Sequence, residues 1–139
     1  STLVNGETVG ADVETAAENG DDYFSTARLS RKQARDTAIS MLEEAKQDEN
    51  ASEDVLNEAS ETLQVLAGYT VAESQIENLV VAKGYTDCVA FMGADSVSVV
   101  VSSPEGLEAA DVARIKDIVI AETDYTAGQI KIMEAGGGK

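Results

Sequence analysis

Apolar residues recur at helical spacing through most of the chain and at strand spacing in its last third. Residues 23–47 contain no Gly or Pro and carry apolar side chains three and four residues apart, which predicts a long helix with a thin apolar stripe. Helix-start signals at Asn50 and Thr70, each followed three residues later by Glu, predict two further helices separated at Gly68. A fourth helix is predicted from Leu107 to about Thr123.

The period changes from helical to two after residue 84. Residues 87–92 and 96–102 predict two strands that a Gly-Ala-Asp turn joins into a hairpin, and residues 129–133 predict a third strand. From residue 70 onward the predicted order is therefore α-β-β-α-β, which is typical of an α+β fold: a three-stranded sheet with two helices on one face, preceded by two additional helices. We expect the third strand to lie beside the first, giving the order two, one, three.

Alternation along the strands assigns their side chains to two faces of the sheet. We expect one set to face the helices: Val89, Phe91, Val97, Val99, Val101, Ile130 and Ile132. The core should then include Leu79, Val99, Ile115 and Ile132. The opposite face, with Cys88 and Ala90, is apolar for one left in water, so it is a candidate partner interface together with the open strand edges. Its members are Met92, Ser98, Val100, Ser102, Lys131 and Met133.

Composition divides the chain into four parts. Residues 1–22 are acidic and contain no base, so we expect a disordered linker. Residues 23–67 form a helical extension, residues 68–135 form the α/β domain, and the Gly-rich residues 136–139 form a flexible tail.

The balance of 26 acidic against 10 basic residues gives a net charge of −16, which disfavours nucleic acid and anionic lipid surfaces as partners. Four basic residues nevertheless gather in the first predicted helix, where they form either a solvated face or a second candidate interface. They are Arg28, Arg31, Lys32 and Arg35.

Residues that carry catalysis are scarce in this sequence. The chain has no histidine, which excludes Ser-His and Cys-His nucleophiles and His-based metal sites. The alternating polar residues that begin at Asp48 match the start of a calcium loop, but the loop fails because Glu53 replaces its glycine and Ala59 its final glutamate. Cys88 is expected to be a small apolar residue, buried or half-buried. We therefore expect no enzyme activity, no cofactor and no metal.

Three stretches resemble the stage III sporulation protein AH family of endospore-forming bacteria. They are residues 76–89, with the junction Lys83-Gly-Tyr-Thr-Asp87 into a Val-rich hairpin, residues 95–101 and residues 111–119. The similarity extends upstream into the helix at residues 29–35. The acidic linker and the Gly-rich tail lie outside the resemblance.

The resemblance implies a function that composition and periodicity do not reach. Members of this family resemble the ring-building modules of type III secretion systems. They are anchored in the outer forespore membrane by one amino-terminal helix, and their soluble part lies between the mother-cell and forespore membranes. There they bind the forespore-membrane protein called stage II sporulation protein Q in a channel or ring complex. The membrane helix is absent from this sequence, so we expect the chain to be an excerpt.

A small ferredoxin-like regulatory or ligand-binding domain is the alternative, because a three-stranded sheet with two helices can pair into a larger sheet around a metabolite. The sequence offers no polar cluster that would recognise such a ligand. We therefore favour a structural subunit that binds its partner and forms a homo-oligomeric ring.

Overall fold

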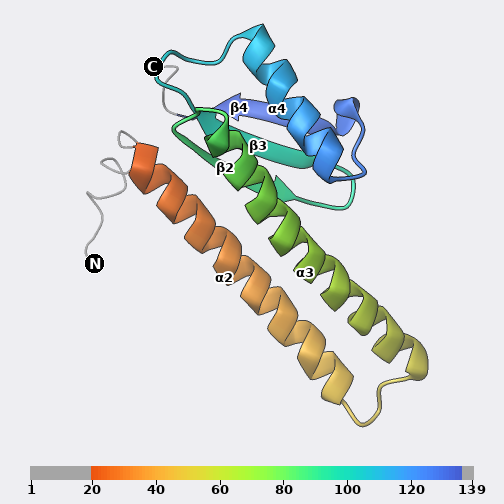
Figure 1. The fold of residues 1–139 in the computed structure, drawn as a ribbon. Helices are drawn as coiled ribbons and strands as arrows, with labels where there is room; N and C mark the ends of the chain where they lie inside the picture. Colours follow the sequence, from red (N-terminus) through yellow and green to blue (C-terminus); the bar gives the residue numbers. More distant parts are fainter. Residues whose placement is uncertain (1–19, 136–139) are drawn as a thin grey trace.

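The computed structural model describes residues 20–135, in which a long helical hairpin leads into a three-stranded sheet (Figure 1). The predicted flexible tail and most of the predicted linker lie outside the described residues, but the linker's last three residues belong to the first helix. The elements in chain order are α2 (Gly20–Gln47), α3 (Glu53–Ala82), β2 (Asp87–Met92), β3 (Val97–Ser102), α4 (Ala109–Glu122), the 3-10 turn η1 (Ala127–Gln129) and β4 (Ile130–Glu134).

The α+β fold with an α-β-β-α-β unit is confirmed, but the prediction of two helices between residues 50 and 84 is wrong. They form one helix of 30 residues, α3, whose N-cap is Ser52 rather than Asn50, since the Ser52 side chain accepts a hydrogen bond from the amide of Val55. Gly68 continues the helix instead of ending it. Thr70 does not cap a new helix; its hydroxyl donates to the carbonyl of Leu66 one turn earlier.

The predicted strand order is also wrong, because the sheet has the order β2-β3-β4. The hairpin is antiparallel, with Val89 opposite Val100, and β4 runs parallel to β3, with Val99 beside Ile132. The α4 crossover therefore joins two adjacent parallel strands. The far edge of β2, where β4 was expected, is occupied by side chains from α2 and α3.

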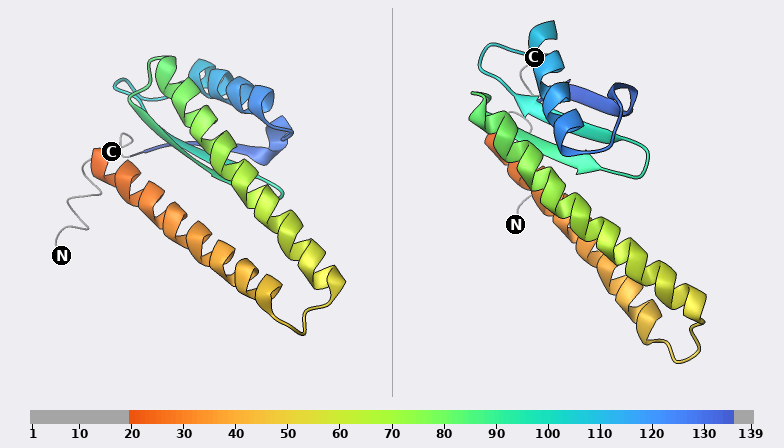
Figure 2. Two further views of the ribbon diagram at one scale, coloured as in Figure 1. Left: turned by 60° about the horizontal axis from the view of Figure 1, so that its bottom comes forward. Right: turned by 45° about the vertical axis from the view of Figure 1, so that its right-hand side comes forward.

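The main core lies between one face of the sheet and the helices α3 and α4 (Figure 2). Ile76 and Val80 of α3 and Ile115 and Val119 of α4 are fully buried there. The sheet side chains in this cluster are Cys88, Ala90, Val97, Val99, Val101 and Ile130, with Met92 and Ile132 partly buried. Leu79, expected in the core, is 38% exposed, whereas Ile76 and Val80 on the same helix are fully buried.

The face assignment is right for β3 and β4 and wrong for β2. Ala90 pairs with Val99 across the hairpin, so the even-numbered residues of β2 face the helices. Val89 faces the opposite side, where it packs with Val100 under Phe24 of α2. Small side chains on the helix side of β2 let α3 approach the strand, and the larger Phe91 lies on the side that α2 covers.

Candidate interaction surfaces

The outer edge of β2 presents backbone groups that no strand satisfies. In an antiparallel pair, alternate residues direct their N–H and C=O groups away from the neighbouring strand. On β2 these residues are Cys88, Ala90 and Met92, whose amides or carbonyls meet side chains instead. Such an edge is ordinarily a template for pairing with another chain.

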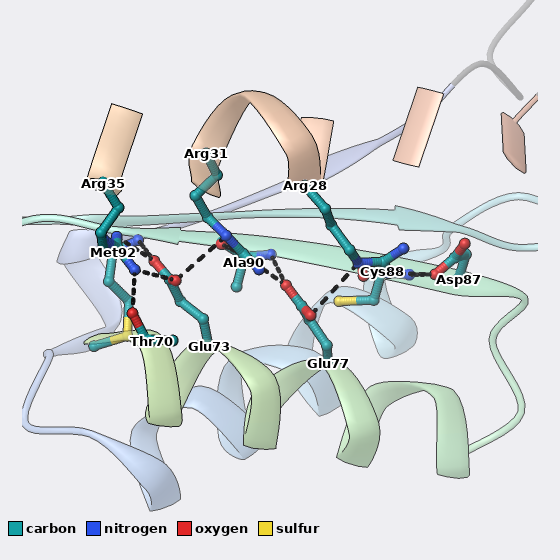
Figure 3. Close-up of polar contacts among 10 residues, drawn as sticks. All are labelled: Arg28, Arg31, Arg35, Thr70, Glu73, Glu77, Asp87, Cys88, Ala90 and Met92. Carbon is teal, nitrogen blue, oxygen red and sulfur yellow. Dashed lines mark hydrogen bonds and ion pairs between the residues drawn. The ribbon is translucent and has the colours of Figure 1, made fainter. Parts of the chain in front are cut away.

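Arginines of α2 satisfy the two edge carbonyls (Figure 3). Arg28 donates to the carbonyl of Cys88 through Nη2. Arg31 donates through Nη1 to the carbonyl of Ala90. Three helix residues rise about 4.5 Å and two strand residues span about 6.6 Å, a difference that long arginine side chains can bridge. Arginines three positions apart on α2 therefore reach carbonyls two residues apart on β2.

Carboxylates satisfy the edge amides in the same way. Two of them come from α3 and one from β2 itself. The amide of Cys88 donates to Asp87 Oδ1 at 2.8 Å, that of Ala90 to Glu77 Oε2 at 2.9 Å, and that of Met92 to Glu73 Oε2 at 2.8 Å.

The same charged groups also bind one another. Arg35 holds both oxygens of Glu73, at 2.8 and 3.1 Å, and Arg31 lies 2.7 Å from Glu77. Arg28 lies 2.7 Å from Asp87. Glu73 has no exposed surface, and the guanidinium groups of Arg31 and Arg35 lie 3.5 and 2.8 Å from its carboxylate. We call this set the edge ladder: Arg28, Arg31, Arg35, Glu73, Glu77 and Asp87.

The surroundings of Arg28 and Arg35 in the edge ladder favour the charged forms of these two side chains. The hydrogen bond from Arg35 to Glu73 raises the pKa of Arg35 despite partial burial. Partial burial lowers the pKa of Arg28, but the hydrogen bond and charge of Asp87 outweigh it and raise the pKa overall. Burial, followed by the nearby charge of Glu77, raises the pKa of the Cys88 thiol to about 12. Cys88 is therefore a neutral packing residue, as predicted.

The first candidate interface is divided between the two faces of the sheet. Met92 lies on the helix side against the main core, because β2 has the opposite facing from the one expected. Val100 is on the outer face but only 6% exposed, because Phe24 covers it. Ser98 and Ser102 are half-buried on that face. The exposed members of the set are Lys131 and Met133 on β4, the latter 43% exposed.

The second candidate interface is largely an internal contact. Arg28, Arg31 and Arg35 belong to the edge ladder, and sequence analysis missed their acidic partners. Lys32 is the member that faces solvent, where it pairs with Asp36 at 2.7 Å. The signal that could have indicated a ladder is the spacing of Arg28, Arg31 and Arg35 together with two glutamates four residues apart on the following helix.

Residues 20–135 contain no group of three or more acidic or cysteine side chains that could hold a metal ion. Within the same range, no helix is both long and apolar enough to cross a membrane. The edge ladder binds α2 and α3 to β2. The fold and its surfaces thus define a class: an α+β protein in which a helical hairpin is fastened by arginines to the edge of an α-β-β-α-β sheet unit.

A sequence model of the SpoIIIAH-like protein family matches residues 4–132. The chain therefore belongs to the SpoIIIAH-like family. A search of curated proteins gave no significant match.

One solved structure supports the fold. One chain of a structure described as the SpoIIQ-SpoIIIAH pore forming complex superposes with a TM-score of 0.69 at 20% sequence identity, over 81% of this chain and 98% of that chain. The type III secretion system protein EscJ of enteropathogenic E. coli has a TM-score of 0.45 at 27% identity, over 53% of this chain and 48% of EscJ. The TM-score with EscJ is too low to support an argument.

Proposed function

We propose that this chain is a non-catalytic structural subunit of a sporulation channel or ring complex, and that it binds a SpoIIQ-like protein of the forespore membrane. Two observations support this proposal. The chain matches the SpoIIIAH-like family, and its fold is similar to that of a chain of the SpoIIQ-SpoIIIAH pore forming complex, 98% of which is covered by the match. In this function the domain lies between the mother-cell and forespore membranes, anchored in the outer forespore membrane by an amino-terminal helix.

The partner docks on the β4 side of the sheet in this proposal. Within the described residues β4 is an edge strand, paired with β3 alone, whereas the edge of β2 is closed by the edge ladder. Lys131 and Met133 on β4 present a basic and an apolar side chain beside that edge. An edge strand flanked by an exposed apolar side chain suits the addition of a partner strand.

The test compares two exposed methionines. Met133→Glu places a charge beside the β4 edge, whereas Met41→Glu places the same charge on α2, where Met41 is 65% exposed. Isothermal titration with the soluble domain of the SpoIIQ-like protein from the same organism should show at least tenfold weaker binding for the first variant and parental binding for the second. Parental binding by both variants would place the interface elsewhere, and Lys32 would be the next residue to substitute.

A further inference from the structure

The sheet has two edges that differ in their backbone chemistry. On β2 the outward amides of Cys88, Ala90 and Met92 and the outward carbonyls of Cys88 and Ala90 all have side-chain partners in the edge ladder (Figure 3). On β4, the described residues pair with β3 on one side and with no strand on the other. Among residues 20–135 the sheet therefore has one closed edge, on β2, and one open edge, on β4.

A sheet with two open edges would be hazardous for a protein that is concentrated at a membrane. The β4 edge of one copy could pair with the β2 edge of the next, and such a head-to-tail contact repeats without closing unless its rotation happens to form a ring. The net charge of −16 opposes association over long range, but screening confines that repulsion to about 8 Å at physiological salt. A short-range device at the edge itself is needed to prevent strand pairing.

We infer that the edge ladder is this device: a surrogate strand, built from side chains, that closes the β2 edge against the β4 edge of a second copy. Two features of the ladder support the inference. It reproduces the alternation of a strand edge, with guanidinium donors on carbonyls and carboxylate acceptors on amides. Glu73 and Glu77 are also buried charges, which are costly to maintain for packing alone. The inference goes beyond partner binding, because it concerns which edge copies of the chain can use for each other.

The test removes one rung of the ladder without changing the net charge. Arg31→Met with Glu77→Met leaves both the amide and the carbonyl of Ala90 without a side-chain partner. Lys32→Met with Asp36→Met is the matched control, because it removes an exposed ion pair from the same helix. Both variants are made in the full 139-residue chain.

Sedimentation velocity over a concentration series should show self-association at least tenfold tighter for the ladder variant than for the parent or the control. Amide exchange at Val99, in the centre of the sheet, verifies that the variant is folded. A peptide of residues 129–135, which carries the β4 sequence, should reverse the association and protect the amide of Ala90, while a scrambled peptide should do neither.

Two results would overturn the inference: self-association equal to that of the parent and the control, or tighter association that the β4 peptide does not reverse. If the ladder variant fails to fold, Arg28→Met with Asp87→Met removes the rung at Cys88 instead, again without changing the net charge. The same two criteria then apply to that variant.

Discussion

The two sides of the sheet contact the helices through different kinds of interaction. On the helix side, α3 and α4 pack Ile76, Val80, Ile115 and Val119 into one continuous apolar cluster. On the other side, α2 contributes a small apolar cluster around Phe24. Its polar contacts with β2 are those of the edge ladder. Apolar burial is non-directional and scales with area, whereas hydrogen-bonded ion pairs demand a particular geometry.

The difference indicates what each side contributes. The helix side supplies most of the free energy of folding, because burial of large aliphatic side chains is the dominant favourable term. The interactions on the α2 side fix the position of α2 along β2, because Arg31 binds both the Ala90 carbonyl and Glu77 in this placement of the helix. A buried ion pair adds little net stability when both partners are present, yet removal of one partner is costly.

The largest expected effect is therefore on the polar side. Glu73→Ala should lower the free energy of unfolding by about 3–5 kcal/mol, because it leaves Arg35 and the amide of Met92 without their buried acceptor. Urea denaturation followed by circular dichroism measures the change. A loss below about 1 kcal/mol would mean that these charges behave as solvated surface groups.

Replacement of both Glu73 and Arg35 tests whether this ion pair fixes the local geometry or contributes to the free energy of folding. Glu73→Leu with Arg35→Leu should recover most of the stability lost in Glu73→Ala, since apolar residues often replace a buried pair without loss. The amide of Met92 should nevertheless exchange faster than in the parent, because its acceptor is gone.

A slightly smaller effect is expected in the apolar core. Ile115→Ala should cost about 2–5 kcal/mol, the range for truncation of a buried aliphatic side chain. Ile120→Ala on the same helix is the control; Ile120 is 42% exposed, whereas Ile115 is fully buried. Equal losses for the two variants would contradict the assigned face of α4. Thermal or urea unfolding provides the comparison.

The spacing of apolar residues predicted the core correctly in elements that have one apolar side. The alternation in β3 and the helical spacing in α4 identified Val99 and Ile115 correctly, since one side of each element is apolar. The same reasoning failed on β2. Residues 88–92 are apolar on both faces of the strand, so their alternation does not indicate which face is turned towards the helices. Leu79 was misplaced for a related reason: its helix has apolar residues around most of its circumference near Val80 and Val81.

Sequence patterns missed the edge ladder for a different reason. The basic residues of α2 were recognised as a group, but an arginine on a helix is most often solvated, and its partners here are up to 60 residues away. Glu73 was assigned to a helix cap because Thr70 precedes it by three residues. Its role depends on the lateral position of α2 beside β2, which is a property of the tertiary structure.

A modest gain in stability is expected from a substitution at Gly68, where the sequence pattern predicts a helix end that the structure does not have. Gly68→Ala should stabilise the chain by about 1 kcal/mol, because alanine restricts the unfolded chain and suits a helix interior. A Cβ at Gly68 would meet no atom within 4 Å, so no clash opposes the gain. A lower melting temperature for this variant would contradict a continuous α3.

The smallest expected effect tests whether ion pairs on α2 matter because of their charge or because of their location. Lys32 and Asp36 are as close, at 2.7 Å, as Arg31 and Glu77, but their side chains are 71% and 57% exposed against 18% and 11%. A double-mutant cycle on Lys32→Met and Asp36→Met should therefore give a coupling free energy of only about 0.3–0.5 kcal/mol.

Because exposed charges are screened, that coupling should fall towards zero in 1 M salt, where the Debye length is about 3 Å. The Arg31–Glu77 coupling should persist in the same salt, since both groups also bind the backbone of β2. Similar couplings with similar salt dependence would show that the edge ladder is an ordinary set of surface pairs.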